Sequence, residues 1–173
     1  MESQRLTRDQ FRGLFPGRQR AFHLELRDEY GVADEIGPFQ SWLKGEPDDH
    51  RWHDSWLRFV RAAVGRGTSI QRARVVTEPW SDYVRWAMTI DPLNLEAGEE
   101  IGYLPRQTVA DISLPDEDYW LIDDDTLVLS LFEPDGSSGG LVLVRDEALI
   151  NQCVQVRDLT WPRAVPYVQY VAA

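Results

Sequence analysis

Cysteine is nearly absent from the 173-residue chain, which contains only Cys153. A single thiol excludes an internal disulfide and any zinc site built from several cysteines. Long apolar runs are also missing. One of the longest, residues 126–132, is far too short to cross a bilayer, and no apolar segment follows the charged first residues as it would in a secretory signal. We therefore expect a cytoplasmic protein with no membrane segment.

Basic residues are missing between Arg106 and Arg145, a stretch that carries nine carboxylates. Residues 1–86 have a net charge of +1, whereas residues 87–173 have a net charge of −12. An acidic surface repels nucleic acid within a Debye length of about 8–10 Å, so direct nucleic-acid binding by the second half is disfavoured. A basic protein partner, such as a DNA-binding regulator, would suit this half. Alternatively, the acidic residues of this half bind a metal or serve only to keep the protein soluble.

The hydrophobic share of 43% and the seven tryptophans indicate a folded domain with a full core. No repeat and no long linker divides the chain, so we expect one domain over residues 1–173, with residues 1–6 frayed.

Helices and strands alternate in the first half. Thr7 and Gln10 resemble a capping box, which predicts a short helix over residues 8–15. Alternating apolar residues predict a strand over residues 21–27, although its Glu and Leu also permit a helix. The other elements expected here are a helix over 34–43 that begins at Asp34 or at Gly37-Pro38, a helix over 54–64 capped by Asp54, a strand over 70–76, and a helix over 81–89 capped by Ser81 and ended by Asp91-Pro92.

A three-stranded meander is expected over about 119–144. Its first two strands flank the turn Asp123-Asp124-Asp125, and a glycine-rich turn leads to the third. A strand over 101–104 precedes the meander, and a helix over 146–157 and a short helix within 165–171 follow it. The order predicts an α/β or α+β fold, with a mixed, mainly antiparallel sheet covered by helices.

Charged side chains cluster most densely between Ile70 and Trp86. Arg72 and Arg74 are two apart and share one face of the predicted strand. Arginine holds phosphate or carboxylate through paired hydrogen bonds, which makes an anion site one interpretation. Its candidate residues are Arg72, Arg74, Arg85, Glu78, Asp82 and Tyr83. The alternative is an internal salt-bridge network with Glu99, Glu100 or the acidic stretch.

Other motifs predict little chemistry. His50 and His53 could hold a metal if they lay on a helix, but a polar loop is favoured. Nothing resembles a nucleophile elbow or a phosphate-binding glycine loop, so no catalytic residue, cofactor or metal is predicted. The candidate residues for a protein interface are Trp80, Trp120, Asp118, Asp123 and Asp124.

Several segments together resemble an actinobacterial family of unknown function, from Streptomyces and its relatives. The resemblance runs from about Phe11 to Tyr167. The segments that carry it include Arg72 to Val75, Glu78-Pro79, Asp82-Tyr83, Ala97-Gly98-Glu99, Asp118 to Leu121, and Arg157-Asp158 with Trp161. Such proteins are often encoded beside helix-turn-helix regulators, which implies a regulatory or accessory role.

The basic strand, its helix and the hairpin Trp-Leu-Ile-Asp-Asp at 120–124 also resemble the half-domain of phospholipase D-like proteins. The active motif of that family needs a histidine and a lysine just ahead of the aspartate, whereas Lys44 lies far upstream. This resemblance implies a similar fold without its catalytic centre.

Two functions follow from the sequence. The first is a non-catalytic regulatory or interaction module whose acidic half binds a helix-turn-helix regulator. The alternative is a sensor or enzyme for a small anion, which requires Arg72, Arg74 and Arg85 to converge in a concave pocket.

Overall fold

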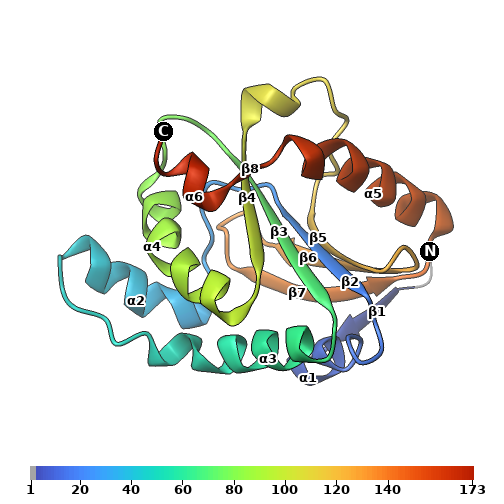
Figure 1. Cartoon of the computed structure of the whole chain (residues 1–173), viewed down its shortest axis with the longest axis horizontal. Coiled ribbons are helices and arrows are strands. Elements are labelled where there is room, and N and C mark those ends of the chain that lie inside the picture. Colours follow the sequence, from blue (N-terminus) through green and yellow to red (C-terminus); the bar gives the residue numbers. More distant parts are fainter. Residues whose placement is uncertain (1–2) are drawn as a thin grey trace.

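Within residues 3–173, which the computed structural model describes, eight strands form one mixed sheet in the order β1-β7-β6-β5-β2-β3-β4-β8 (Figure 1). The strands are β1 (Ser3–Leu6), β2 (Arg20–Glu25), β3 (Ser69–Val76), β4 (Glu100–Pro105), β5 (Asp118–Ile122), β6 (Thr126–Phe132), β7 (Ser138–Val144) and β8 (Val165–Pro166). Strands β2, β3 and β4 are parallel, and the other named pairs are antiparallel. The predicted sheet type and the C-terminal meander, β5 to β7, are confirmed.

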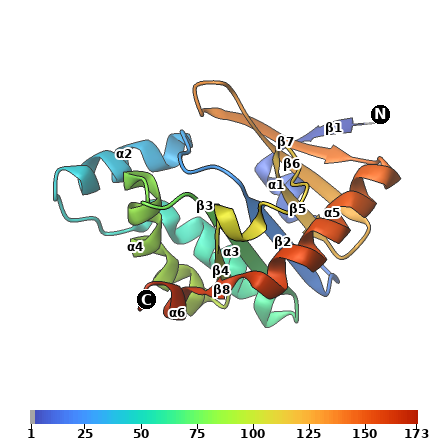
Figure 2. The ribbon, with the colours of Figure 1, turned by 90° about the horizontal axis from the view of Figure 1, so that it is seen from above.

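Helices cover both faces of the sheet. They are α1 (Arg8–Arg12), α2 (Ala33–Leu43), α3 (Asp54–Gly65), α4 (Asp82–Ala97), α5 (Glu147–Thr160) and α6 (Tyr167–Tyr170), with short 3-10 helices η1 (Arg51–His53), η2 (Arg106–Val109) and η3 (Trp161–Arg163). Helices α3 and α4 lie on one face, the α4 face, and α5 lies on the opposite one, the α5 face (Figure 2). None of the helices in residues 3–173 is both long and apolar enough to cross a membrane.

Strand β2 shows how alternation divides side chains between the two faces. Phe22 and Leu24 belong to the core under α5, whereas Ala21 packs under α1 and α3. His23 and Glu25 point to the same side as Ala21, because successive side chains on a strand alternate. The strand predicted over 21–27 is confirmed and the helix alternative is wrong. The alternation of side chains along β2 also places two polar side chains, His23 and Glu25, on the α4 face.

The helix-start signals at Thr7 and Ser81 are correct. Thr7 and Gln10 form the reciprocal hydrogen bonds of a capping box. Ser81 caps α4 by accepting a hydrogen bond at 3.1 Å from the backbone N–H three residues later. Asp34 and Asp54 do not act as caps. They lie in the first turns of α2 and α3, where their charge still suits the helix dipole.

Two prolines lie inside helices that they were expected to begin or end. Helix α2 starts five residues before Pro38, next to the alternative start at Asp34, and α4 continues through Pro92, so the boundaries expected at the two prolines are wrong. Pro92 has no N–H for the carbonyl of Met88. The hydroxyl of Tyr167, at the start of α6, donates to that carbonyl at 2.8 Å. A distant side chain therefore satisfies the group that the proline leaves free.

Both ends of the described chain join the edges of the sheet. Residues 3–6, within the segment expected to fray, form β1 and pair with β7. Residues 1 and 2 of that segment lie outside the described residues. At the other edge β8 pairs with β4, and α6 forms the short helix expected in the C-terminal tail.

Candidate functional site

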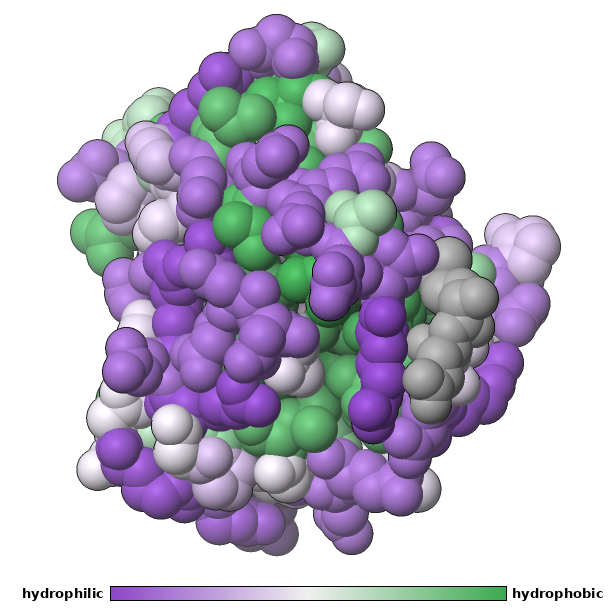
Figure 3. Space-filling view, turned by 90° about the vertical axis from the view of Figure 1, so that its right-hand side faces the viewer, coloured by the Kyte–Doolittle hydropathy of each residue, from purple (hydrophilic) through white to green (hydrophobic). Residues whose placement is uncertain are grey.

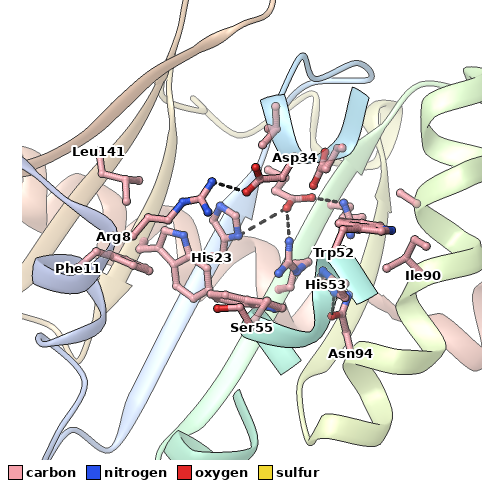
Figure 4. Close-up of a pocket in the computed structure, with 18 of the residues that line it drawn as sticks. Arg8, Phe11, His23, Asp34, Trp52, His53, Ser55, Ile90, Asn94 and Leu141 are labelled. Atoms are coloured by element: carbon pink, nitrogen blue, oxygen red, sulfur yellow. Dashed lines mark hydrogen bonds and ion pairs between the residues drawn. The ribbon is translucent and has the colours of Figure 1, made fainter. Parts of the chain in front are cut away.

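A pocket of about 290 Å³ opens on the α4 face. Strands β2, β3 and β5 form its floor, and α1, α3 and α4 form its walls (Figure 4). Residues from the start of α2 and from η1 close the remaining side. Elements from distant parts of the chain therefore meet at one cavity, which is a common location for a small-molecule site.

Large aromatic side chains line two sides of the pocket. Trp52 stacks with Trp86 at a centroid distance of 5.7 Å, and Tyr83 meets Trp86 edge-on at 5.4 Å. On the opposite side Trp56 meets Trp120 edge-on at 5.7 Å. Mutual contacts between large rings hold each ring in place. The pocket thus has stiff walls that can pack against a flat or apolar ligand.

The floor of the pocket is a buried charge network centred on Glu25. The register of β2 and β3 sets Glu25 opposite Arg74, and both Arg74 and Arg72 donate hydrogen bonds to its carboxylate. Arg72 Nε also donates to Glu99 Oε1 at 2.6 Å, and Arg74 Nη2 donates to Asp91 Oδ1 at 3.0 Å. Two guanidinium groups therefore bind three carboxylates, which leaves one negative charge in excess.

The protonation of Glu25 follows from two opposed effects. Burial would raise its pKa, but the charges of Arg74 and Arg72 outweigh burial and lower the pKa to about 2. Glu25 is therefore ionised at neutral pH. The Tyr103 hydroxyl donates to the second oxygen of Asp91 at 2.5 Å, so the outer end of the network is also held in place.

His23 lies on this floor, with its ring stacked on Trp120 at a centroid distance of 4.2 Å and an interplanar angle of 13°. Only 9% of the residue is exposed. Neither ring nitrogen has a hydrogen-bond partner among the described residues. The nearest acidic oxygen, Oε1 of Glu25, is 3.6 Å from Nδ1. Burial lowers the pKa of His23 to about 3, so the ring is neutral and has one free donor and one free acceptor.

Two further polar groups border the pocket. The Glu35 carboxylate, on α2, accepts a hydrogen bond from the Tyr83 hydroxyl at 2.6 Å, and burial raises the pKa of Glu35. His53 Nε2 lies 2.7 Å from Asn94 Oδ1, and burial lowers the pKa of His53. Both side chains therefore have internal partners, unlike His23.

The residues predicted for an anion site divide into two groups. Arg72, Arg74 and Tyr83 line the pocket. Arg85 instead pairs with Asp82 at 3.3 Å on the exposed side of α4. The sixth candidate, Glu78, accepts a hydrogen bond from the Tyr170 hydroxyl at 2.5 Å, outside the pocket. The salt-bridge network that was the alternative interpretation is present for the two pocket arginines, with Glu99 as one partner.

The residues predicted for an interface have internal partners. Trp120 is buried in the pocket floor, and Asp118 is buried where it accepts a hydrogen bond from the Tyr30 hydroxyl at 2.5 Å. Trp80 donates to the Tyr170 hydroxyl at 2.9 Å. Asp123 and Asp124 form ion pairs with Arg18, Arg20 and Arg157. Part of the acidic stretch is thus neutralised by arginines.

The side of the molecule bearing the N-terminus and α5 is mostly hydrophilic, with apolar side chains visible between polar ones (Figure 3).

The two histidines considered for a metal bind separate partners. His50 Nδ1 lies 3.0 Å from the Asp48 carboxylate, whereas His53 bonds to Asn94. In residues 3–173 no three or more His, Cys, Asp or Glu side chains are grouped so as to hold a metal ion.

Sequence reasoning missed His23, Glu25, Glu35 and Trp56. One available signal was the spacing of His23 and Glu25, which places two polar side chains on one face of a strand whose other face is wholly apolar. The role of Glu35 and Trp56 depends on how α2 and α3 fold back over the sheet, and no local pattern predicts that.

The fold is similar to that of a phospholipase D family member, Nuc from Salmonella typhimurium. The TM-score is 0.50 and the identity 9%, and the match covers 96% of each chain. No histidine or lysine lies in residues 113–122 ahead of Asp123, so the likeness concerns the fold.

TrmBL2, an archaeal chromatin protein, also matches, with a TM-score of 0.46 and 11% identity over 95% of this chain. This chain spans 53% of the TrmBL2 chain, about half of its length. No curated protein matches the sequence. The model of one family, described as a domain of unknown function, DUF6879, matches residues 9–172. The chain therefore belongs to the DUF6879 family.

Proposed function

We propose that this domain is a non-catalytic sensor that binds a small molecule in the pocket on the α4 face. The observation that carries the proposal is His23, a nine-tenths buried side chain with two unpaired ring nitrogens at the floor of an aromatic cavity. A buried polar group without a partner costs about 1–3 kcal/mol. A ligand that bonds to His23 would recover this free energy on binding.

The chemistry of the floor favours binding over catalysis. A histidine with a pKa near 3 is a poor general acid or base at neutral pH, where an efficient catalyst has a pKa near the working pH. Glu25 is held by Arg72 and Arg74, and each of these arginines also pairs with a second carboxylate. The groups that could transfer a proton or clamp an anion are thus already neutralised.

Helix α2 connects the pocket with the surface. Asp34 pairs with Arg8 of α1 at 2.5 Å, and the next residue, Glu35, bonds to Tyr83 of α4. The start of α2 therefore spans the pocket mouth from one wall to the other. A bound ligand would act on these two contacts and so on the position of α2.

In this proposal the sensor acts in the cytoplasm and reports to a basic protein, such as a DNA-binding regulator. The net charge of −12 on residues 87–173 supports a basic partner. Complex formation should weaken steeply as salt is raised, because opposite surface charges drive the association. A complex that is unaffected by salt would contradict this part of the proposal.

A thermal-shift screen of the full chain tests the sensor itself. The panel should include cationic, neutral and anionic metabolites. A ligand at about one hundred times its Kd adds about 2.7 kcal/mol, which raises the Tm of a chain of this size by about 5–11 °C. We expect such a hit to disappear in His23→Phe and to persist in His50→Phe, the same change outside the pocket. No shift with any class, or a hit retained in His23→Phe, would overturn the proposal.

A further inference from the structure

The charges of the network that lies in and directly behind the pocket floor do not balance. Glu25, Asp91 and Glu99 face Arg72 and Arg74, so the network has one negative charge in excess. The side chains of Asp91 and Glu99 are fully buried, and that of Glu25 is 9% exposed. A buried charge that is not compensated is unfavourable, because the protein interior solvates it poorly. The site therefore favours a ligand that brings a positive charge.

The other cationic groups near the pocket do not supply that charge. His23 is neutral at physiological pH because burial lowers its pKa. Arg8 lies at the solvent-exposed rim and is paired with Asp34. Arg12 also lies at the rim, where it donates to the Ser55 hydroxyl at 3.1 Å. Water screens charges at the rim, so neither arginine compensates the floor.

The walls of the pocket also suit a cation. The face of an aromatic ring attracts positive charge, most strongly for tryptophan, and the attraction grows when the pair is shielded from water. The Trp56 ring already receives Arg72 at 5.9 Å, which shows that a cation is accommodated against this wall. In Figure 4, His23 lies between Arg8 on α1 and the Trp52 and His53 side of the cavity.

We infer that the pocket binds a small organic monocation that carries N–H donors, such as an amidinium or a primary ammonium on an apolar or aromatic body. The inference rests on the proposed sensor function. It assigns the ligand a positive charge, whereas the arginines alone suggested an anion. The acceptor nitrogen of His23 receives one N–H of the cation. The positive charge offsets the network, and the apolar body packs against the tryptophans.

Three probes of nearly the same shape test the charge. Benzamidine is a cation, benzamide is neutral and benzoate is an anion, so their affinities for the full chain can be compared by titration calorimetry. We expect benzamidine to bind about tenfold or more tightly than benzamide, which corresponds to about 1.4 kcal/mol, and benzoate to bind least. Benzylamine should bind more tightly than benzyltrimethylammonium, which has no N–H to donate to His23.

Two variants test the source of the preference. Glu99→Gln removes one buried carboxylate and should abolish the preference for benzamidine over benzamide. Glu100→Gln, the same change at the next, exposed residue, should leave it intact. If Glu99→Gln does not fold, Trp52→Leu replaces a wall ring by an apolar side chain and should lower benzamidine affinity more than benzamide affinity.

The outcomes separate the two proposals. Equal binding of benzamidine and benzamide, tighter binding of benzoate, or no binding of any of the five probes would overturn the cation assignment. The sensor function would still stand if the thermal-shift screen yields a neutral or anionic ligand that requires His23. A cation preference that survives in a folded Glu99→Gln would also refute the inference, because it would show that the buried excess charge is not its cause.

Discussion

Replacing His23 with phenylalanine should stabilise the ligand-free protein, although the residue lies at the centre of the proposed site. The substitution removes two buried nitrogens that have no partner, and it keeps an aromatic ring stacked on Trp120. The ring borders the cavity, so the larger phenylalanine extends into open space and not into close-packed core. Function and stability would therefore change in opposite directions.

The size of this stabilisation follows from the two unpaired nitrogens of His23. Leaving a buried donor or acceptor without a partner costs about 1–3 kcal/mol. After allowing for some local adjustment, we expect the free energy of unfolding to rise by about 1–2 kcal/mol at neutral pH. For a chain of this length that corresponds to an increase in Tm of about 2–8 °C.

The stability advantage of His23→Phe over the wild type should be larger at acidic pH. The pKa of His23 is lowered from 6.5 to about 3, so between these values the unfolded chain binds a proton that the folded chain does not. The wild type therefore loses stability as pH falls through this window, and the phenylalanine variant avoids that loss. The extra difference is on the order of a few kcal/mol across the window.

Urea unfolding followed by tryptophan fluorescence, at about pH 7 and about pH 5, measures both effects. The control is His53→Phe, the same substitution at a pocket histidine that has a partner. It should destabilise the protein, because it leaves the buried Asn94 side chain without its 2.7 Å contact. If His23→Phe lowers stability at pH 7 as His53→Phe does, the His23 nitrogens are satisfied and the reasoning about the pocket fails.

Three other substitutions test features of the fold. Burial raises the pKa of Asp118 from 3.8 to about 7, so between these values the folded chain holds a proton that the unfolded chain has lost, and the wild type becomes less stable as pH rises. Asp118→Asn does not titrate, so its free energy of unfolding relative to the wild type should rise by a few kcal/mol from about pH 4 to pH 7 in urea titrations. Tyr167→Phe leaves the Met88 carbonyl without the hydroxyl and should cost about 1 kcal/mol in the same assay; an unchanged midpoint would show that the proline needs no compensation. Gly102→Ala puts a Cβ 2.7 Å from that of Ala164 and should cost about 1–3 kcal/mol, seen as a lower Tm.

Much of the sheet could be predicted because its signals are local. The alternation in β2 and the aspartate turn before β6 each depend on a few neighbouring residues. Asp123 tolerates the positive φ of 50° that this turn requires, as aspartate often does. The end of α4 could not be predicted in this way. Pro92 normally interrupts a helix, and its compensation comes from Tyr167 in another element.

The candidate site was only partly predictable for the same reason. The spacing of Arg72 and Arg74 placed both on one strand face, and both reach the pocket. Their partners Glu25, Asp91 and Glu99 come from β2, α4 and the residue before β4, so the cancellation of their charge depends on topology. A pair of arginines in a sequence therefore indicates a charged site but does not determine the sign of its ligand.

The position of β2 has a consequence for synthesis of the protein. This strand is hydrogen-bonded to β3 on one side and to β5 on the other. Strand β5 leaves the ribosome about 100 residues later, which takes roughly 5–20 s at about 5–20 residues per second. During that time one edge of β2, which includes Phe22 and Leu24, has no neighbouring strand, and such edges promote aggregation. A nascent chain that stalls before the meander would therefore depend on chaperones, and the N-terminal half expressed alone should be recovered in inclusion bodies.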